Sequence, residues 1–203
     1  MKIHELTEEQ FTIALNQWAQ DIEFDGDFVI DEFKRSMEPY VEDMDIRWSG
    51  FWSQGDGASF SGSVNLLAVL DYIDTTNNHY LYRELMRAGE LYQTAKLSNT
   101  GHYCHEGMMD LEYPDCYTSN QVVSKGPLMG LDLNTLADGD EYDANDKIAQ
   151  LVQAGADEVL AWLKDQAREL YKELEQDYEY QTSKEQFIEW AEANEVEFDY
   201  EEA

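Results

Sequence analysis

The sequence predicts an α+β fold in which several helices pack around a small antiparallel sheet made of two hairpins. Three observations predict it: apolar residues recur at helical spacing near both ends, residues 44–64 alternate apolar with polar positions around glycines, and a second glycine-containing segment follows near residue 101. With 203 residues, 43% of them hydrophobic, the chain can bury one ordinary core. We expect a single domain over residues 1–180 and an acidic C-terminal helix and tail over residues 181–203.

Two helices are expected before residue 40. Thr7-Glu8-Glu9-Gln10 has the form of a capping box, in which Thr7 begins a helix and Gln10 reaches back to its backbone N–H. Apolar residues at helical spacing extend this helix to about residue 22; they are Phe11, Ala14, Leu15, Trp18 and Ile22. Gly26 separates it from a second, shorter helix, which Pro39 ends.

The middle of the chain predicts two hairpins and two helices. Residues 44–64 form the first hairpin, because Gly55-Asp56-Gly57 offers a turn that accepts a positive φ. Helical spacing then predicts helices over residues 66–73 and 80–97. The second hairpin is expected to run through residues 100–105 and back through residues 108–113, where Pro114 ends it.

The C-terminal part predicts a loop and two further helices. Residues 118–140 contain glycines and a proline and are interpreted as a loop. From Asp146 to about Gln176 the apolar residues form one stripe with a 3.6-residue period, interrupted only by Gly155, which indicates a long amphipathic helix. A last, acidic helix is expected from Ser183 onward.

The chain carries 44 acidic and 13 basic residues, a formal net charge of −31. The excess is concentrated at the ends: residues 1–46 have a net charge of −10 and residues 173–203 of −11. A charge that served only solubility would be spread more evenly. We therefore interpret the termini as an acidic binding surface, with a solvated surface that has no partner as the alternative.

This charge disfavours several functions. A strongly negative field repels nucleic-acid phosphates and anionic lipids, and no basic run opposes it, so we expect neither direct nucleic-acid binding nor membrane binding. No apolar stretch approaches the roughly 20 residues that span a bilayer, and the N-terminus has no signal-peptide core. The expected location is the cytoplasm, with Cys104 and Cys116 reduced.

No metal site is expected. The candidate ligands for a soft metal are His102, Cys104, His105 and Cys116. Zinc ligands usually occur in spaced pairs, whereas Cys104 and His105 are adjacent and in a strand would point to opposite faces. A calcium loop that began at Asp138, in the acidic segment 138–146, would need glycine at its sixth and glutamate at its twelfth position, where the chain has Asp143 and Ala149. The segment is better interpreted as a helix-capping loop.

No catalytic site is expected either. Ser53 or Ser59 could be drawn into a triad with Asp56 and His102, but no nucleophile elbow accompanies these residues. The turn at Gly55-Asp56-Gly57 lacks the lysine of a phosphate-binding loop, and its aspartate would repel phosphate. The prediction is a non-enzymatic protein without a cofactor.

Carboxylates at a helical step of four residues are the remaining chemical signal. Four helical residues rise by about 6 Å, close to the roughly 7 Å between phosphates along a DNA strand. Lysines and an arginine run beside the acids over residues 164–172, so that part fits ordinary ion pairs equally well. We therefore place the predicted partner-binding surface further on, joined by N-terminal acids if the termini pack together. These residues are Glu173, Glu175, Asp177, Glu179, Glu185, Glu189, Glu192, Asp21, Glu23, Asp25 and Asp27.

One segment carries a resemblance to other proteins. The string Trp48-Ser49-Gly50-Phe51-Trp52-Ser53-Gln54-Gly55-Asp56-Gly57-Ala58-Ser59-Phe60 is similar to a segment of uncharacterised proteins encoded by tailed bacteriophages and some bacteria, and Gly101-His102-Tyr103-Cys104-His105 fits the same resemblance. It covers about a tenth of the chain and brings no activity to any residue. It implies a phage protein that acts in a bacterial cytoplasm.

The resulting hypothesis is a phage-encoded DNA mimic that blocks the nucleic-acid groove of a bacterial defence or DNA-processing enzyme of the restriction, CRISPR or nuclease type. Its association would be steered by charge and weakened by salt. One alternative is an antitoxin-like inhibitor or adaptor that binds through apolar surface, which exposure of Trp48, Trp52 or Trp190 would favour. A small metal-dependent enzyme around Asp56 and His102 is the other. The target and the oligomeric state stay open, although a two-fold homodimer would lengthen the charged surface.

Overall fold

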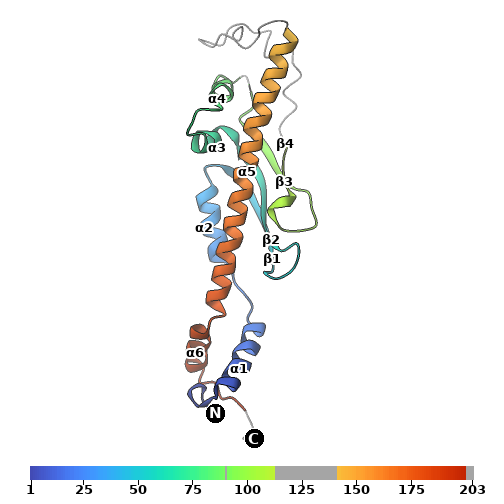
Figure 1. Cartoon of the computed structure of the whole chain (residues 1–203). Helices are drawn as coiled ribbons and strands as arrows, with labels where there is room; N and C mark the ends of the chain where they lie inside the picture. Colours follow the sequence, from blue (N-terminus) through green and yellow to red (C-terminus); the bar gives the residue numbers. More distant parts are fainter. Residues whose placement is uncertain (90, 113–140, 200–203) are drawn as a thin grey trace. The chain divides into compact units, whose positions relative to one another are not determined.

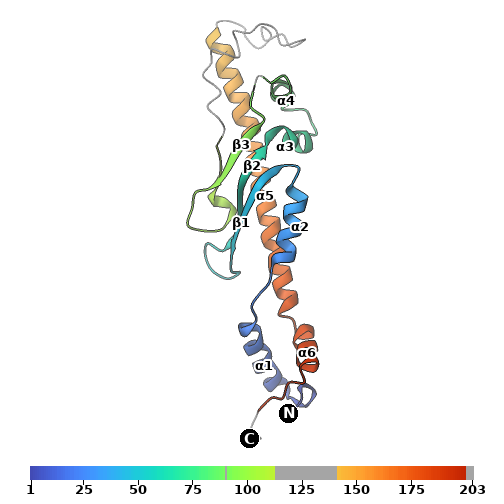
Figure 2. The same cartoon turned by 180° about the vertical axis from the view of Figure 1, so that it is seen from behind.

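In the computed structural model, the described residues (1–89, 91–112 and 141–199, with side chains from residue 149 onward in the last range) form six α-helices and a four-stranded antiparallel sheet (Figures 1 and 2). The helices are α1 (Glu8–Asp21), α2 (Asp27–Met37), α3 (Leu66–Ile73), α4 (Tyr80–Arg87), α5 (Glu141–Gln181) and α6 (Lys184–Ala193). The strands are β1 (Val41–Ser49), β2 (Gly57–Asn65), β3 (Thr94–Asn99) and β4 (Met109–Glu112), with single 3-10 turns η1 (Ile3–Glu5) and η2 (Glu106–Met108). The predicted α+β class is confirmed.

Packing divides the chain into two compact units. Unit 1 comprises residues 1–31 and 172–203, and unit 2 comprises residues 32–171. The long helix α5, orange in Figure 1, contributes its last turns to unit 1 and the rest to unit 2. The predicted division into residues 1–180 and 181–203 stays a prediction.

The sheet of unit 2 has the strand order β1-β2-β3-β4, and each strand pairs antiparallel with the next. The register places Val41 opposite Val64, and Gly62 opposite Leu97, which in turn lies opposite Leu111. Both predicted hairpins are therefore present. The second is shifted, because β3 begins at Thr94 and the predicted strand residues 100–105 lie in the connection between β3 and β4.

The predicted helix over residues 80–97 is correct only in its first half. Helix α4 ends at Arg87, and Gly89 follows in the left-handed region with a φ of +75°, which ends a helix readily because glycine has no side chain to clash. Further on, Ala95 and Leu97 are buried and alternate with exposed neighbours in β3. Apolar residues in this stretch fit both the helical and the strand period, and pairing with β2 selects the strand.

Helix α5 packs on the sheet and is longer than predicted, since residues 141–146 of the expected acidic loop are already helical. Much of the predicted apolar stripe is buried, since Val152, Val159, Leu163, Ala167 and Leu170 are all at most 2% exposed, whereas Leu151 and Leu160 are partly buried. The glycine that interrupts it also has a packing reason, because a Cβ on Gly155 would lie 2.5 Å from the ring of Tyr82 in α4. The helix thus approaches α4 closely at this point.

Unit 1 joins the two ends of the chain. The predicted capping box is present, with Gln10 N–H donating to Thr7 Oγ1 at 3.3 Å and Thr7 N–H donating to Gln10 Oε1 at 2.9 Å. The Met1 amino group donates to the Phe198 carbonyl at 2.9 Å, and the Phe198 N–H donates back to the Met1 carbonyl at 2.9 Å. The core of the unit is formed by Ile3, Ala14, Phe187 and Ala191.

Replacing Ser183 by alanine is expected to destabilise unit 1 by about 1 kcal/mol, because Ser183 Oγ caps α6 by accepting the Gln186 N–H at 3.3 Å. The measurement is urea unfolding followed by circular dichroism. Thr182→Ala is the matched control, since the Thr182 hydroxyl only donates back to the Tyr178 carbonyl within the α5 end, and its loss is expected to cost less than about 0.5 kcal/mol. Equal effects of the two substitutions would contradict the capping role.

Candidate functional site

All eleven predicted partner-binding carboxylates lie in unit 1. They come from the end of α1 and the segment that leads into α2 (Asp21, Glu23, Asp25 and Asp27), from the last turns of α5 (Glu173, Glu175, Asp177 and Glu179), and from α6 (Glu185, Glu189 and Glu192). Nine are exposed, and Glu175 and Asp177 are partly buried. The structure thus brings these acids together in one packed unit.

Aromatic packing is what joins the two acidic ends. Phe187 of α6 contacts Phe11 and Trp18 of α1, each with ring centroids 5.3 Å apart. Phe187 is fully buried, so this contact stabilises the unit through the hydrophobic effect as well as through ring geometry. The condition set by the sequence, that the termini pack together, is met.

A second contact fixes the acids of residues 21–27 beside those of α5. The Gln181 side-chain amide donates to the Asp25 carbonyl at 2.8 Å and to the Asp177 carboxylate at 2.9 Å. Phe24 packs edge-on against Tyr178, with ring centroids 5.5 Å apart. Gly26 permits this approach, because a Cβ there would lie 2.8 Å from a methyl group of Leu174. Asp25 and Asp177 are therefore held in neighbouring positions.

The charge balance of the two units differs strongly. Unit 1 contains 20 acidic and three basic residues in 63 positions, whereas unit 2 contains 24 acidic and 10 basic residues in 140 positions. In unit 1, Lys184 lies over the ring of Phe11 at 5.1 Å, and His4 Nε2 lies 2.8 Å from the Glu192 carboxylate. Acids therefore dominate the field around unit 1.

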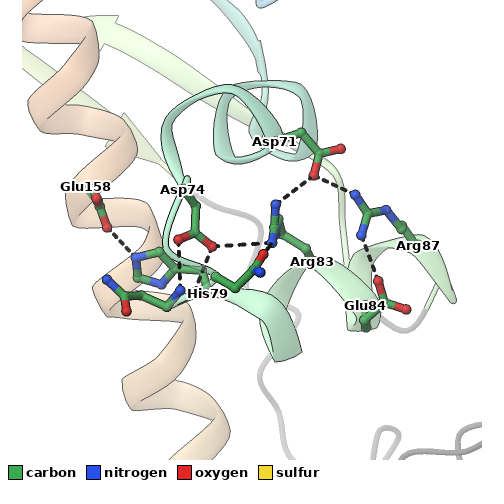
Figure 3. Close-up of polar contacts among 9 residues, drawn as sticks. Asp71, Asp74, His79, Arg83, Glu84, Arg87 and Glu158 are labelled. Atoms are coloured by element: carbon green, nitrogen blue, oxygen red, sulfur yellow. Dashed lines mark hydrogen bonds and ion pairs between the residues drawn. The ribbon is translucent and has the colours of Figure 1, made fainter.

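Unit 2 contains a buried polar cluster that the sequence interpretation missed (Figure 3). Its centre is Asp74, only 5% exposed, which accepts hydrogen bonds from the backbone N–H groups of Asn78 at 2.8 Å and His79 at 2.9 Å. Burial alone would raise the pKa of Asp74, but these hydrogen bonds and the Arg83 guanidinium outweigh it and hold the pKa below the ordinary value of 3.8. The carboxylate is therefore charged at neutral pH.

The rest of the cluster ties α3, α4 and α5 together. Arg83 lies 3.5 Å from Asp74 and donates to Asp71 at 3.2 Å, and Asp71 also binds Arg87 at 2.5 Å. The buried ring of His79 contacts the Glu158 carboxylate of α5. Each acid in the cluster binds a basic group, so we assign the cluster a structural role. The available signal was the polar run from Asp74 to Asn78 ahead of an amphipathic helix, which is typical of a turn that caps backbone groups.

The glycine-rich segment within residues 48–60 forms an aspartate-centred turn in unit 2. Asp56 accepts from the backbone N–H groups of Ser53 at 2.5 Å and Trp52 at 3.0 Å, and from the Ser49 hydroxyl at 3.1 Å. The hydrogen bond from Ser53 is the largest cause of a lowered pKa at Asp56, opposed by a partial desolvation. Gly55 has a φ of +101°, as the predicted turn requires. Asp56 therefore organises the turn.

The residues weighed for catalysis have other partners. Ser59 is buried and accepts from the Asn99 amide at 2.5 Å, and the ring of His102 lies edge-on to Tyr103. Within the described part of the chain, no hydrogen bond joins the hydroxyls of Ser53 or Ser59 to Asp56 or His102, and no group of three or more potential ligands could hold a metal ion. Cys116, residues 138–140 of the calcium candidate and the side chains of its residues 141–146 lie outside the described part of the structure.

A family model described as a domain of unknown function (DUF8835) matches residues 18–184, which is more than half of the chain. No curated protein and no solved structure matches. The matched range includes the sheet, α5 and the acids up to Glu179, and ends before Glu185 in α6. Among the described helices, none is long and apolar enough to cross a membrane.

Proposed function

We propose that this chain, which belongs to the DUF8835 family, is a non-enzymatic inhibitor that presents an acidic surface to the nucleic-acid groove of a bacterial defence or DNA-processing enzyme. This acidic surface consists of the eleven predicted partner-binding carboxylates of unit 1. By occupying the groove, it would exclude the real substrate. The phage origin and the cytoplasmic site of action rest on the resemblance of residues 48–60.

The observation that carries this proposal is the gathering of the predicted acids from two distant parts of the sequence in one small unit with 20 acids and three bases. The packing of Phe187 and the bridge through Gln181 hold these parts of the chain together, and all of the acids except Glu23 and Asp25 lie on helices. Prearranged charge matters because ordering a mobile acidic tail on binding would cost conformational entropy. Such a surface favours fast, steered association with a basic groove.

The test is capture of partners from bacterial lysate on the immobilised full-length protein at about 0.1 M and about 0.5 M salt, with bound proteins identified by mass spectrometry. The Debye length falls from about 10 Å to under 5 Å between these conditions. We expect to capture a nucleic-acid enzyme that is retained at low salt and lost at high salt. Duplex DNA should displace this enzyme from the immobilised protein. A partner with no nucleic-acid role that resists high salt would refute the proposal.

Exposed tryptophan favours a second candidate, an inhibitor or adaptor that binds through apolar surface. The side chain of Trp52 is 77% exposed at the aromatic turn of unit 2, and Trp190 in α6 is 40% exposed. Large exposed aromatic side chains are enriched at binding sites. This candidate predicts that Trp52→Ala removes a salt-resistant partner, whereas the acidic inhibitor predicts no effect of that substitution.

A further inference from the structure

Unit 1 contains a groove of about 470 Å³ along α6, which we call the Trp18–Trp190 groove. Its lining includes Trp18 and Ile22 near the end of α1, Gln181 at the end of α5, and Gln186, Glu189 and Trp190 of α6. All of these residues belong to unit 1. The groove therefore lies in the unit that carries the acidic surface.

The groove has an aromatic wall. The rings of Trp18 and Trp190 have centroids 5.9 Å apart and are inclined by 40°, and Phe187 stacks behind Trp190 at 6.2 Å. Trp190 remains 40% exposed, so part of its indole surface faces solvent. The face of an indole ring attracts cations, and the planar guanidinium of arginine most often takes this position in proteins.

Negative charge surrounds this wall. Glu189 lines the groove and keeps its carboxylate exposed, with one hydrogen bond from Gln186 at 3.3 Å. The carbonyl end of a helix carries partial negative charge, which a basic residue in the last turn usually offsets. Helices α1, α5 and α6 each have no basic residue in the last turn, and the end of each contributes a residue to the lining. The groove thus combines an aromatic surface with an exposed carboxylate and with helix ends that have no basic residue in their last turn.

We propose that the Trp18–Trp190 groove receives an arginine side chain from the basic surface of the protein partner. This inference rests on the proposed function and specifies how the partner is recognised. A guanidinium can stack on Trp190 and form two parallel hydrogen bonds with Glu189, whereas a lysine ammonium makes a single point contact and an apolar side chain gains nothing from the carboxylate. The overall charge of unit 1, 20 acids against three bases, favours a cationic occupant over an anionic one.

The test compares two fluorescently labelled peptides of equal charge, nine arginines and nine lysines, for binding to the full-length protein at about 0.1 M salt. We expect the arginine peptide to bind roughly 3- to 10-fold more tightly, as a partly desolvated contact between a cation and an indole ring allows. Trp190→Leu should lower the affinity for the arginine peptide about 5-fold and change the affinity for the lysine peptide less than about 2-fold. Trp52→Leu, at an exposed tryptophan of unit 2, is the matched control and should change neither.

Further variants separate this inference from the proposed function. Glu189→Gln, at an exposed position, should reduce the preference for arginine about 3-fold and serves if Trp190→Leu disturbs folding. Equal affinity for the two peptides, or a preference that survives both variants, would overturn the arginine site. Lysine substitutions at Glu173, Glu179 and Glu185 should weaken the binding of both peptides. If they do not, the acidic surface is not the binding surface and the proposed function is refuted. If these substitutions weaken the binding of both peptides but the protein shows no preference for arginine, only the inference about the groove is refuted.

Discussion

Replacing Glu173, Glu179 and Glu185 by lysine is expected to reduce capture of the partner at least 10-fold at about 0.1 M salt. The three side chains are exposed and belong to unit 1, so the substitutions change the acidic surface and leave the core intact. Each substitution shifts the charge by two, which brings the net charge from −31 to −25 and places repulsive lysines against a basic groove. The measurement is the association rate and affinity for the captured enzyme by surface plasmon resonance.

The matched control carries the same change in net charge elsewhere. Lysine substitutions at Glu38, Glu42 and Asp45, which are exposed residues of unit 2, should alter the affinity by less than about 3-fold. Because long-range steering depends on the total charge, both variants should slow association somewhat, but only the first should also speed dissociation. Equal losses in the two variants would show that net charge, and not the acidic surface of unit 1, determines binding.

Replacing Asp74 by alanine is expected to destabilise unit 2 by about 3 kcal/mol or more. The substitution removes the acceptor for two backbone N–H groups and leaves Arg83, only 7% exposed, with a weaker set of anionic partners. Breaking one side of a buried ion pair is costly because the remaining charge loses its compensation. Urea unfolding at neutral pH, followed by tryptophan fluorescence, measures the change.

Asp71→Asn is the control within the same cluster. The Asp71 side chain is 42% exposed and its ion pairs are screened by solvent, so its loss should cost less than about 1 kcal/mol. A larger effect at Asp71 than at Asp74 would contradict the assignment of Asp74 as the centre of the cluster.

The effect of Asp74 should also depend on pH in a defined direction. The pKa of Asp74 is lower in the folded protein than its ordinary value of 3.8, so the folded state favours the charged carboxylate. Its contribution is fully present above pH 3.8 and is lost as the pH falls through the lower folded pKa. The difference in unfolding free energy between the wild type and Asp74→Asn should therefore be constant from about pH 7 to pH 5 and shrink below about pH 4. Comparing the two proteins at each pH cancels the effect that protonation of the many other carboxylates has on the unfolding free energy.

Local signals located the elements that the sequence predicted best. Helix α1 runs over Glu8–Asp21 against a predicted 8–22, and α3 covers the predicted residues 66–73. The cap that the sequence indicated at Thr7 is present, and α6 begins directly after Ser183, where the last helix was predicted to start. These elements begin and end at residues whose own side chains or neighbours determine the backbone, so no distant contact was needed to predict them.

The sequence-based predictions were wrong where contacts between residues far apart in the sequence determine the local structure. Residues 94–97 fit a helix by period, but antiparallel pairing with β2 makes them a strand. The loop between β3 and β4 was predicted as strand for the same reason, because the register is set across the sheet and not along the chain. The cluster of Asp74, His79 and Glu158 escaped notice because Glu158 lies 79 residues after His79 in the sequence, and no local pattern links it to the turn that Asp74 and His79 form.

The sequence by itself determined that the protein is acidic at both ends, which residues carry that charge, and that helices, one of them long and amphipathic, accompany a small antiparallel sheet. Charge is a property of composition and position, and the periodicity of apolar residues specifies one buried face, so both can be obtained from the chain alone. Only the tertiary structure decided that the two acidic ends form one unit and that Trp18 and Trp190 line a groove within it. The physical reason is that burial of Phe187 against α1 depends on side chains more than 160 residues apart, and no local pattern encodes such a contact.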